Sequence, residues 1–185
     1  MALPKPMIGA PVSATGGVAA GPVSTPLPTD ATTELDAALA KLGLVGEDGV
    51  TLTRDRSTED KKAWGGLTVR TVQSEFSETA ALSFLESDKA EVLKEVYGES
   101  NVTIAAGKIA IKHNELVLEN RVWVFEMKDG KKRRRIVLPN AAITATDDIQ
   151  YVHSELISYG VTITAYPDEA GNVAYEYIDD PTVTP

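Results

Sequence analysis

Two His-x-Glu triplets carry the residue types best suited to chemistry in this sequence. They are His113-Asn114-Glu115 and His153-Ser154-Glu155. Residues i and i+2 of a strand face the same side, so the triplets could together supply two histidines and two carboxylates to a metal ion. A pattern this short is expected by chance, and the His-x-Glu signature of zinc deaminases also requires a Pro-Cys-x-x-Cys motif. We therefore interpret these histidines as ordinary surface residues, with a metal-binding β-domain as the alternative.

The sequence lacks the other motifs on which catalysis commonly depends. It contains no cysteine, which excludes disulfides, thiolate zinc sites and cysteine nucleophiles. It contains no Gly-x-Ser-x-Gly elbow and neither of the common glycine-rich phosphate-binding motifs. The acid pairs Asp147-Asp148 and Asp179-Asp180 would point to opposite faces of a strand, so neither forms an acid/base dyad. The sequence predicts a protein that is not an enzyme and uses no cofactor.

Charge is distributed unevenly along the chain. The net charge is −9, whereas a nucleic-acid binder needs excess Lys and Arg to displace counterions from phosphates. Five basic residues follow the turn signal Asp129-Gly130, and no Lys or Arg occurs after them. Complementary patches favour head-to-tail self-association, although a solvated basic turn would have the same sequence. The candidate inter-subunit contact is Lys131, Lys132, Arg133, Arg134 and Arg135, and the candidate acidic lumen or complementary surface is Asp147, Asp148, Glu155, Asp179 and Asp180.

Residues 1–30 differ in composition from the rest of the chain. They hold six of the ten prolines among Gly, Ala, Ser and Thr, with no period of 2 or 3.6. Such a segment cannot bury enough apolar surface to order itself alone. We expect an extended N-terminal arm, residues 1–30, that contributes Pro26, Pro28 and Asp30 to a subunit contact, and one domain, residues 31–185. No apolar run of about 18 residues occurs, so no membrane anchor is expected.

Two short helices are predicted. Over residues 32–42, Thr32 or Thr33 could cap a helix whose leucines and alanines recur at i, i+3, i+4 and i+7 before Gly43. A second helix begins where Asp88 and Glu91 have capping-box spacing, and Gly98 follows it in the position that ends many helices. The second helix is expected to cover one side of a sheet.

Most of the remaining chain reads as short strands separated by turns. Turn signals occur at Asp48-Gly49, Asp129-Gly130 and Gly171-Asn172. The pattern predicts a mainly β fold, an antiparallel β-sandwich or barrel flanked by one α-helix, in which Trp64 and Trp123 are core or interface anchors. The strands are expected at 50–53, 68–75, 79–85, 102–112, 116–127, 136–143, 161–166 and 173–178.

Six segments, taken in order, resemble the major tail tube proteins of long-tailed (siphovirus-type) bacteriophages. The segments extend over nearly the whole chain, and their order and spacing carry the resemblance. Gly160 departs from the pattern, because a bulkier residue is expected there. The segments are residues 25–30, 42–50, 62–66, 95–98, 135–141 and 159–167.

This resemblance implies a fold related to Hcp-type tube proteins and a structural role in the virion tail. Such subunits form hexameric rings whose inner sheets join into one barrel, and the rings stack around a tape measure protein. Tail terminator and distal tail proteins would be further partners, after assembly in the host cytoplasm. An acidic lumen would let genomic DNA pass without specific binding, because it repels phosphates.

Other structural roles remain open on the sequence. The chain could be a tube subunit of a secretion system or tailocin, or another virion protein such as a capsid decoration or tail terminator subunit. The metal-binding β-domain built on His113, Glu115, His153 and Glu155 belongs to a different class of function.

Overall fold

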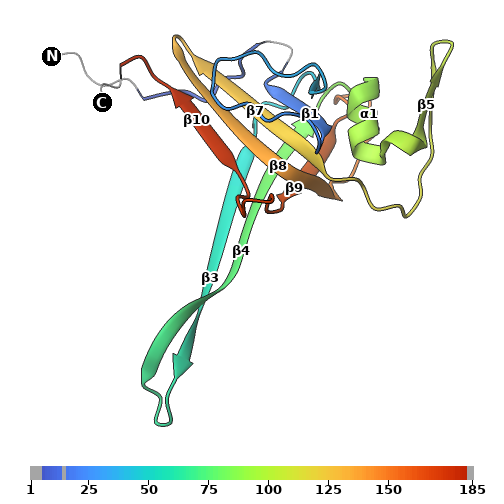
Figure 1. Ribbon diagram of the computed structural model, residues 1–185. Coiled ribbons are helices and arrows are strands. Elements are labelled where there is room, and N and C mark those ends of the chain that lie inside the picture. The colour runs from blue at the N-terminus through green and yellow to red at the C-terminus, as the bar shows by residue number, and fades with distance from the viewer. Residues whose placement is uncertain (1–5, 14–15, 183–185) are drawn as a thin grey trace.

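The computed structural model describes residues 6–13 and 16–182, which form antiparallel β-structure and one α-helix (Figure 1). This confirms the predicted fold class. The helix α1 (Ala90–Tyr97) is followed by the short 3-10 helix η1 (Glu99–Asn101). The strands are β1 (Val18–Pro22), β2 (Ala40–Lys41), β3 (Thr51–Lys62), β4 (Thr68–Phe84), β5 (Val102–Ala105), β6 (Lys108–Ile111), β7 (Arg121–Asp129), β8 (Lys132–Thr146), β9 (Tyr159–Ala165) and β10 (Tyr175–Asp179).

The main sheet branches at β8. Its strand order is β2-β1-β7-β8-β9-β4-β3, with β10 paired to β8 outside this path. One edge of β8 pairs with β7. The other edge pairs with β10 at residues 133–137 and with β9 at residues 141–146, so the sheet divides into two halves beyond β8. A separate two-stranded sheet contains β5 and β6.

Residues 42–46 link β1 back to β4 and so nearly close the sheet on itself. The Leu42 N–H donates to the Val18 carbonyl (3.0 Å), and the Gly46 N–H donates to the Ser83 carbonyl (2.8 Å). The barrel-like enclosure holds the larger apolar core, in which Trp123 and Phe84 stack with ring centroids 6.5 Å apart. Trp123 is therefore a core anchor, as the sequence predicts.

The helix α1 covers part of this core with Val92, Leu93 and Val96. Its C-terminus agrees with the sequence prediction: Gly98 has a φ of 89°, and its N–H donates to the Lys94 carbonyl. The predicted capping box is wrong, because the N-cap residue is Lys89 and no side chain caps the helix.

The helix predicted over residues 32–42 is also wrong, since this segment consists of turns and the short strand β2. The Asp30 carboxylate accepts hydrogen bonds from the N–H groups of Thr32 (2.7 Å) and Thr33 (2.6 Å), which closes a local turn. Leu39 then packs in a smaller apolar cluster, whereas Leu42 packs in the main core. The leucine spacing therefore serves two sides of a sheet and not one face of a helix.

Pro139 lies inside β8, where it would remove a hydrogen bond from a regular ladder. The β7–β8 register shifts between Arg121, which opposes Ala141, and Trp123, which opposes Leu138. This β-bulge places Pro139 at an irregular point of the sheet, which is where a buried strand tolerates proline.

Candidate assembly surfaces

The β3–β4 hairpin projects far from the body of the molecule (Figure 1). β4 pairs with β9 only from Glu78 to Phe84, so the outer residues of the hairpin pair only with each other. Between residues 54 and 77, Val72 and Phe76 are half-buried and all other residues are exposed. A two-stranded hairpin is only marginally stable in water, and this one is long.

The core-facing row of β4 continues outward onto this hairpin. Phe84, Leu82 and Ala80 are buried core residues, and Glu78 and Phe76 follow on the same face at intervals of two. Arg54 makes an ion pair with Glu78 at 3.0 Å, and the Arg56 guanidinium lies 5.3 Å from the Phe76 ring centroid. Where this face leaves the body, Glu78 and Phe76 are therefore covered by the side chains of Arg54 and Arg56 from the same hairpin.

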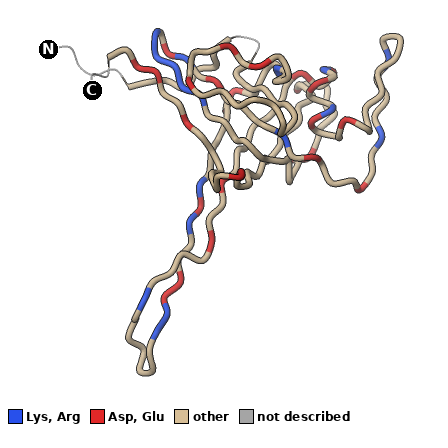
Figure 2. The backbone as a smooth tube through the Cα atoms, in the orientation of Figure 1, with Lys and Arg blue, Asp and Glu red and all other residues tan. Residues whose placement is uncertain are grey.

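Both signs of charge occur along the hairpin, as Figure 2 shows. Residues 51–84 carry five basic and five acidic side chains, so the hairpin is neutral and the net charge of −9 belongs to the rest of the chain. The basic residues are Arg54, Arg56, Lys61, Lys62 and Arg70, and the acidic residues are Asp55, Glu59, Asp60, Glu75 and Glu78.

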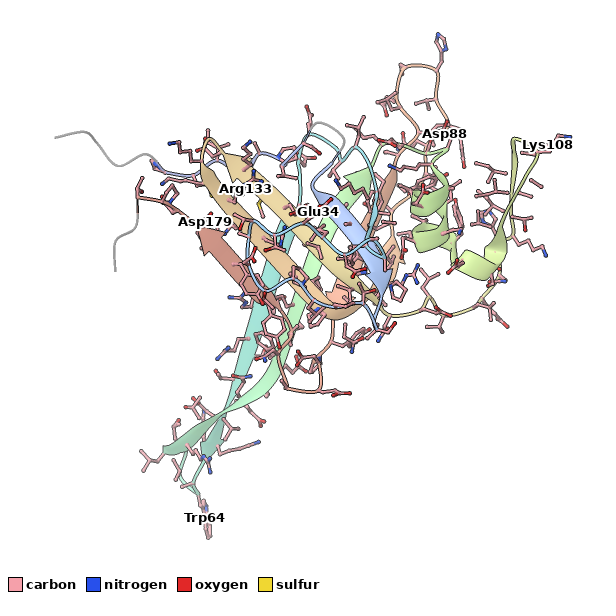
Figure 3. All side chains as sticks on the ribbon, turned by 45° about the horizontal axis from the view of Figure 1, so that its top comes forward. Glu34, Trp64, Asp88, Lys108, Arg133 and Asp179 are labelled. Atoms are coloured by element: carbon pink, nitrogen blue, oxygen red, sulfur yellow. The ribbon has the colours of Figure 1, made fainter. Side chains whose placement is uncertain are left out.

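The tip of the hairpin presents apolar side chains to solvent. Trp64 is fully exposed (107%) and points away from the body in Figure 3. Leu67 and Val69 beside it are also exposed. Gly65 and Gly66 form the turn with φ values of 105° and 88°, which favour glycine. Trp64 is therefore not a core residue, and its predicted role as an interface anchor stays a prediction.

The predicted basic run lies at the β7–β8 turn, where β10 runs beside it. Lys132 pairs with Asp180 at 2.7 Å, and Arg134 pairs with Glu176 at 2.5 Å. Arg133 opposes Asp179 in the register of β8 and β10, and the two are neighbours in Figure 3. Lys132 and a hydrogen bond from Thr182 lower the pKa of Asp180 to about 2. Much of the run is thus used within the chain, and the contact role of Lys131 and Arg133 stays a prediction.

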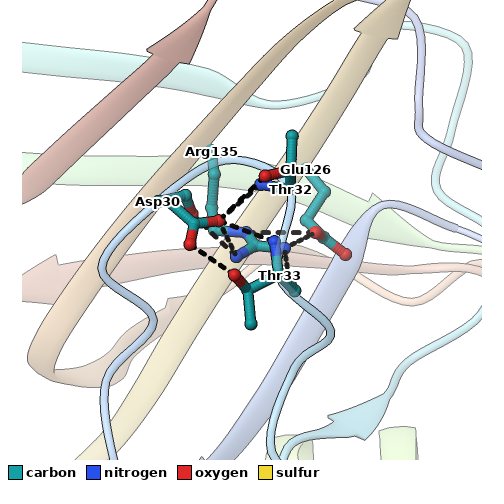
Figure 4. Close-up of polar contacts among 5 residues, drawn as sticks. All are labelled: Asp30, Thr32, Thr33, Glu126 and Arg135. Carbon is teal, nitrogen blue, oxygen red and sulfur yellow. Dashed lines mark hydrogen bonds and ion pairs between the residues drawn. The ribbon is translucent and has the colours of Figure 1, made fainter.

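Arg135, the last residue of the run, is buried, and Figure 4 shows its polar contacts. Its guanidinium donates to the carbonyls of Asp30 (2.7 Å) and Thr33 (2.7 Å) and to the Glu126 carboxylate (2.6 Å). The Asp30 carboxylate accepts hydrogen bonds from Thr33 and Thr32, which hold its pKa well below the usual range. Arg135 therefore fastens residues 30–33 to the sheet.

The segment fastened by Arg135 covers the outer face of β1, β7, β8 and β10. Leu27 and Leu35 pack there against Val122, Val124 and Val137. Pro26 is exposed, whereas Pro28 and Asp30 are half-buried on this segment. An inter-subunit role for the three residues stays a prediction.

The described residues of the expected arm, 6–13 and 16–30, lie on the body in this conformation. Val18–Pro22 is the strand β1, between β2 and β7. Residues 10–12 follow β7, where the Lys128 N–H donates to the Ala10 carbonyl (2.8 Å). Residues 1–5 of the expected arm lie outside the described residues. That residues 1–30 extend to contact another subunit in an assembly stays a prediction.

The predicted acidic surface is split between two places. Asp147, Asp148 and Glu155 are exposed in the loop from β8 to β9, whereas Asp179 and Asp180 lie where β10 ends. These places are at opposite ends of β8, a strand of 15 residues. One copy of the chain does not gather the five acids into one patch, and a lumen built from several copies stays a prediction.

The alternative hypothesis was a metal site built on the two His-x-Glu triplets. Among the described residues, no group of three or more His, Cys, Asp or Glu side chains could hold a metal ion. The His113 ring instead contacts the Tyr97 ring at 4.9 Å between centroids. Within the same residues, no helix has the length and hydropathy to cross a membrane.

Comparison with known proteins identifies the family. A model of the family described as phage tail tube protein matches residues 8–185. The chain belongs to the phage tail tube protein family. It is therefore a structural protein of the phage tail, as the resemblance in the sequence implied.

Two further comparisons give no information on the function of the chain. No curated protein matches the chain. Among solved structures, the cryo-EM structure of the anti-feeding prophage cap (AFP tube terminating cap) is similar with a TM-score of 0.49 and 10% identity, covering 97% of this chain and 95% of that one.

Apart from Trp64, predicted to be a core or interface anchor, sequence reasoning assigned no role to the projecting part of the hairpin. The strand expected at 50–53 extends to Lys62, and the strands expected at 68–75 and 79–85 are one strand, β4. The signal in the sequence was Trp64-Gly65-Gly66 between two polar, threonine-containing segments, which is the composition of an exposed hairpin with a glycine turn.

Proposed function

We propose that this tail protein is the subunit of the tail tube itself. Copies associate side by side into hexameric rings, and the rings stack into a conduit for DNA from capsid to host cell. The observation that supports this most is the β3–β4 hairpin, whose outer part has apolar residues at its tip and no cover from the described chain beyond its own strands. A second copy of the chain supplies the missing contact.

Open sheet edges support the lateral contacts of a ring. Among described residues, β10 pairs on one edge alone, and the β4 edge that meets β9 at residues 78–84 has no partner at residues 68–77. Unpaired edges invite pairing with other chains, and closing a ring satisfies them in a finite structure. Such pairing would join the sheets of neighbouring copies.

The charge distribution supports a conduit. The hairpin is neutral, so the body of each copy carries the excess acid that lines the lumen. A tape measure protein fills this lumen before ejection, and DNA then passes without specific binding because like charges repel. Tail terminator and distal tail proteins bind the two ends of the tube. Assembly takes place in the host cytoplasm, without an enzymatic step or a membrane anchor.

Electron microscopy of the purified protein tests the proposal. Concentrated protein should form stacked rings with sixfold symmetry, and persistent monomers would contradict it. A shortened variant, with residues 57–75 replaced by an Asn-Gly turn between Arg56 and Phe76, should fold but form no tubes. The matched control places Asn-Gly at the Ala106-Gly107 turn of β5 and β6, where φ is already positive at both residues. Normal tubes from the shortened variant would show that the hairpin is not needed for assembly.

A further inference from the structure

A groove lies near the end of the body from which β3 begins. It has a volume of about 550 Å³ and is lined by residues 8–11, 16–18, 44–50 and 125–127. Phe125 is buried at the groove, whereas Ile8 (66%) and Leu44 (44%) are exposed apolar residues that line it. This volume is within the range of sites that bury an organic ligand, and it can accept an indole ring.

The groove is held open by hydrogen bonds of its own walls. The Leu44 N–H donates to the Glu86 carboxylate (2.9 Å), and the Leu44 carbonyl accepts from the Leu85 N–H (3.0 Å). On the other wall, the Glu126 N–H donates to the Gly17 carbonyl (2.6 Å). Both walls are therefore tied to the sheet, and a guest would meet a preformed surface.

The groove and the tip of the β3–β4 hairpin have complementary charges. Among the described residues, Glu47, Asp48 and Glu126 are the charged side chains that line the groove, with no Lys or Arg beside them. Residues 61–70 of the tip segment contain Lys61, Lys62 and Arg70 and no acid. Since Glu126 pairs with Arg135 in the same chain, Glu47 and Asp48 are the groove acids that can face a partner.

The tip cannot reach the groove of its own chain. β3 begins next to the groove, at Thr51, and runs for 12 residues to Lys62, which separates the two by roughly 40 Å at about 3.3 Å per residue. Figure 1 shows the hairpin leaving the body away from β1, and Figure 3 shows Trp64 at its far end. A contact between tip and groove must join two copies head to tail, and such a contact propagates along an axis.

We propose that Trp64 and Leu67 of one copy insert into the groove between Ile8 and Leu44 of the next copy, with Lys62 and Arg70 facing Glu47 and Asp48. The contact is axial and connects one ring to the next. This inference rests on the proposed tube, because it names the surface that receives the hairpin. The exposed Trp64 side chain is then a buried anchor in the assembled tail.

Disulfide trapping tests the pairing directly, because the natural chain has no cysteine. A variant with Leu67→Cys and Leu44→Cys should, under mild oxidation of the assembled tubes, give a ladder of covalent oligomers on a non-reducing gel. A matched variant combines Leu67→Cys with Val117→Cys, an exposed apolar position (93%) outside the groove, and should give no ladder. Equal ladders from both variants would overturn the inference.

A charge exchange tests the same contact without cysteine. Lys62→Glu with Arg70→Glu, and separately Glu47→Lys with Asp48→Lys, should each raise the protein concentration needed for tube growth by about tenfold. Mixing the two variants, or combining all four changes in one chain, should restore growth because the charges again complement each other. No restoration, with both variants folded, would contradict the assigned partner.

Quenching of tryptophan fluorescence separates this inference from the proposed function. Acrylamide should quench Trp64 in the monomer and lose access to it in tubes, while Trp123 is shielded in both. Trp64→Phe supplies the signal of Trp123 alone. Tubes in which Trp64 stays quenchable would overturn the tip-in-groove contact and leave the tube proposal standing. Absence of any tube would instead overturn the proposed function, and the inference with it.

Discussion

The Glu78 carboxylate accepts two hydrogen bonds from the Arg54 guanidinium, at 3.0 and 3.3 Å, where the β3–β4 hairpin leaves the body. The Glu78 side chain is buried (4% exposed), whereas the Arg54 side chain is largely in solvent (63%). Hydrogen bonding to Glu78 raises the pKa of Arg54. The pair therefore neutralises a buried acid at the residue where the pairing of β4 with β9 ends.

Arg54→Ala should destabilise the monomer by about 1 kcal/mol, because it leaves the buried Glu78 carboxylate without its donor. The exposure of Arg54 keeps the effect small. Urea unfolding measures it, with Arg70→Ala as the control, since Arg70 is an exposed arginine of the same hairpin beyond the body. Equal stabilities of the two variants would show that solvent replaces Arg54 at no cost.

Arg135→Met should destabilise the fold by about 3 kcal/mol, because a buried guanidinium that serves two carbonyls and Glu126 is lost. Hydrogen exchange should lose protection at Thr32 and Thr33, whose turn is fastened by this side chain. Adding Glu126→Gln should recover part of the stability, since no unpaired, half-buried carboxylate then remains. An unchanged unfolding midpoint for the single variant would contradict the structural role of Arg135.

The sequence predicts the parts of the fold in which local chemistry and tertiary packing agree. Trp123 lies in the apolar run of β7 and is buried, and Gly98 ends α1 with a positive φ. The leucines at 35, 39 and 42 have helical spacing but are divided between two cores, and that division depends on Arg135, which is about a hundred residues away in the chain.

The length of the projecting hairpin escaped prediction for a related reason. Strand patterns are read from alternating burial, and both faces of residues 54–71 are exposed in one copy. In the proposed tube a second copy covers the hairpin, so its burial pattern would be complete only in the assembly. The basic run was recognised, but the sequence could not show that Arg135 points into the protein while Lys131 remains outside.

The burial of Arg135 defines how the contact role of the basic run should be tested. Lys131→Glu with Arg133→Glu should raise the concentration needed for tube formation by up to about fivefold, the range expected of exposed ion pairs. Reversing Arg134 or Arg135 as well would break intrachain ion pairs and confuse assembly with folding. Assembly is followed by light scattering, with thermal unfolding as the check on the fold. Unaltered assembly by the folded variant would show that the run serves its own chain.

The Lys132–Asp180 pair should make stability depend on pH in acid. The folded pKa of Asp180 is about 2, below its ordinary value of 3.8, so the pair stabilises the folded state above that ordinary value. This contribution is lost as the pH falls from 3.8 toward 2. Asp180→Asn should therefore flatten the fall of the thermal midpoint across this window. Asp179→Asn, one residue away, is the control. If it changed the pH dependence of the thermal midpoint equally, Asp180 would not be the cause.

Gly160 and Asp147 make a steric pair that explains why glycine stands where the family pattern predicted a larger residue. A Cβ at Gly160 would lie 2.2 Å from Asp147 Oδ2, while the Asp147 N–H donates to the Gly160 carbonyl at 2.8 Å. Gly160→Ala should cost at most about 1 kcal/mol, because the exposed Asp147 side chain must turn away from the new Cβ but has solvent to turn into. Asp147→Ala in the same chain should recover most of this loss, which urea unfolding of the two single variants and the double variant measures as a coupling energy. Additive effects would mean that another neighbour, and not Asp147, limits the size of residue 160.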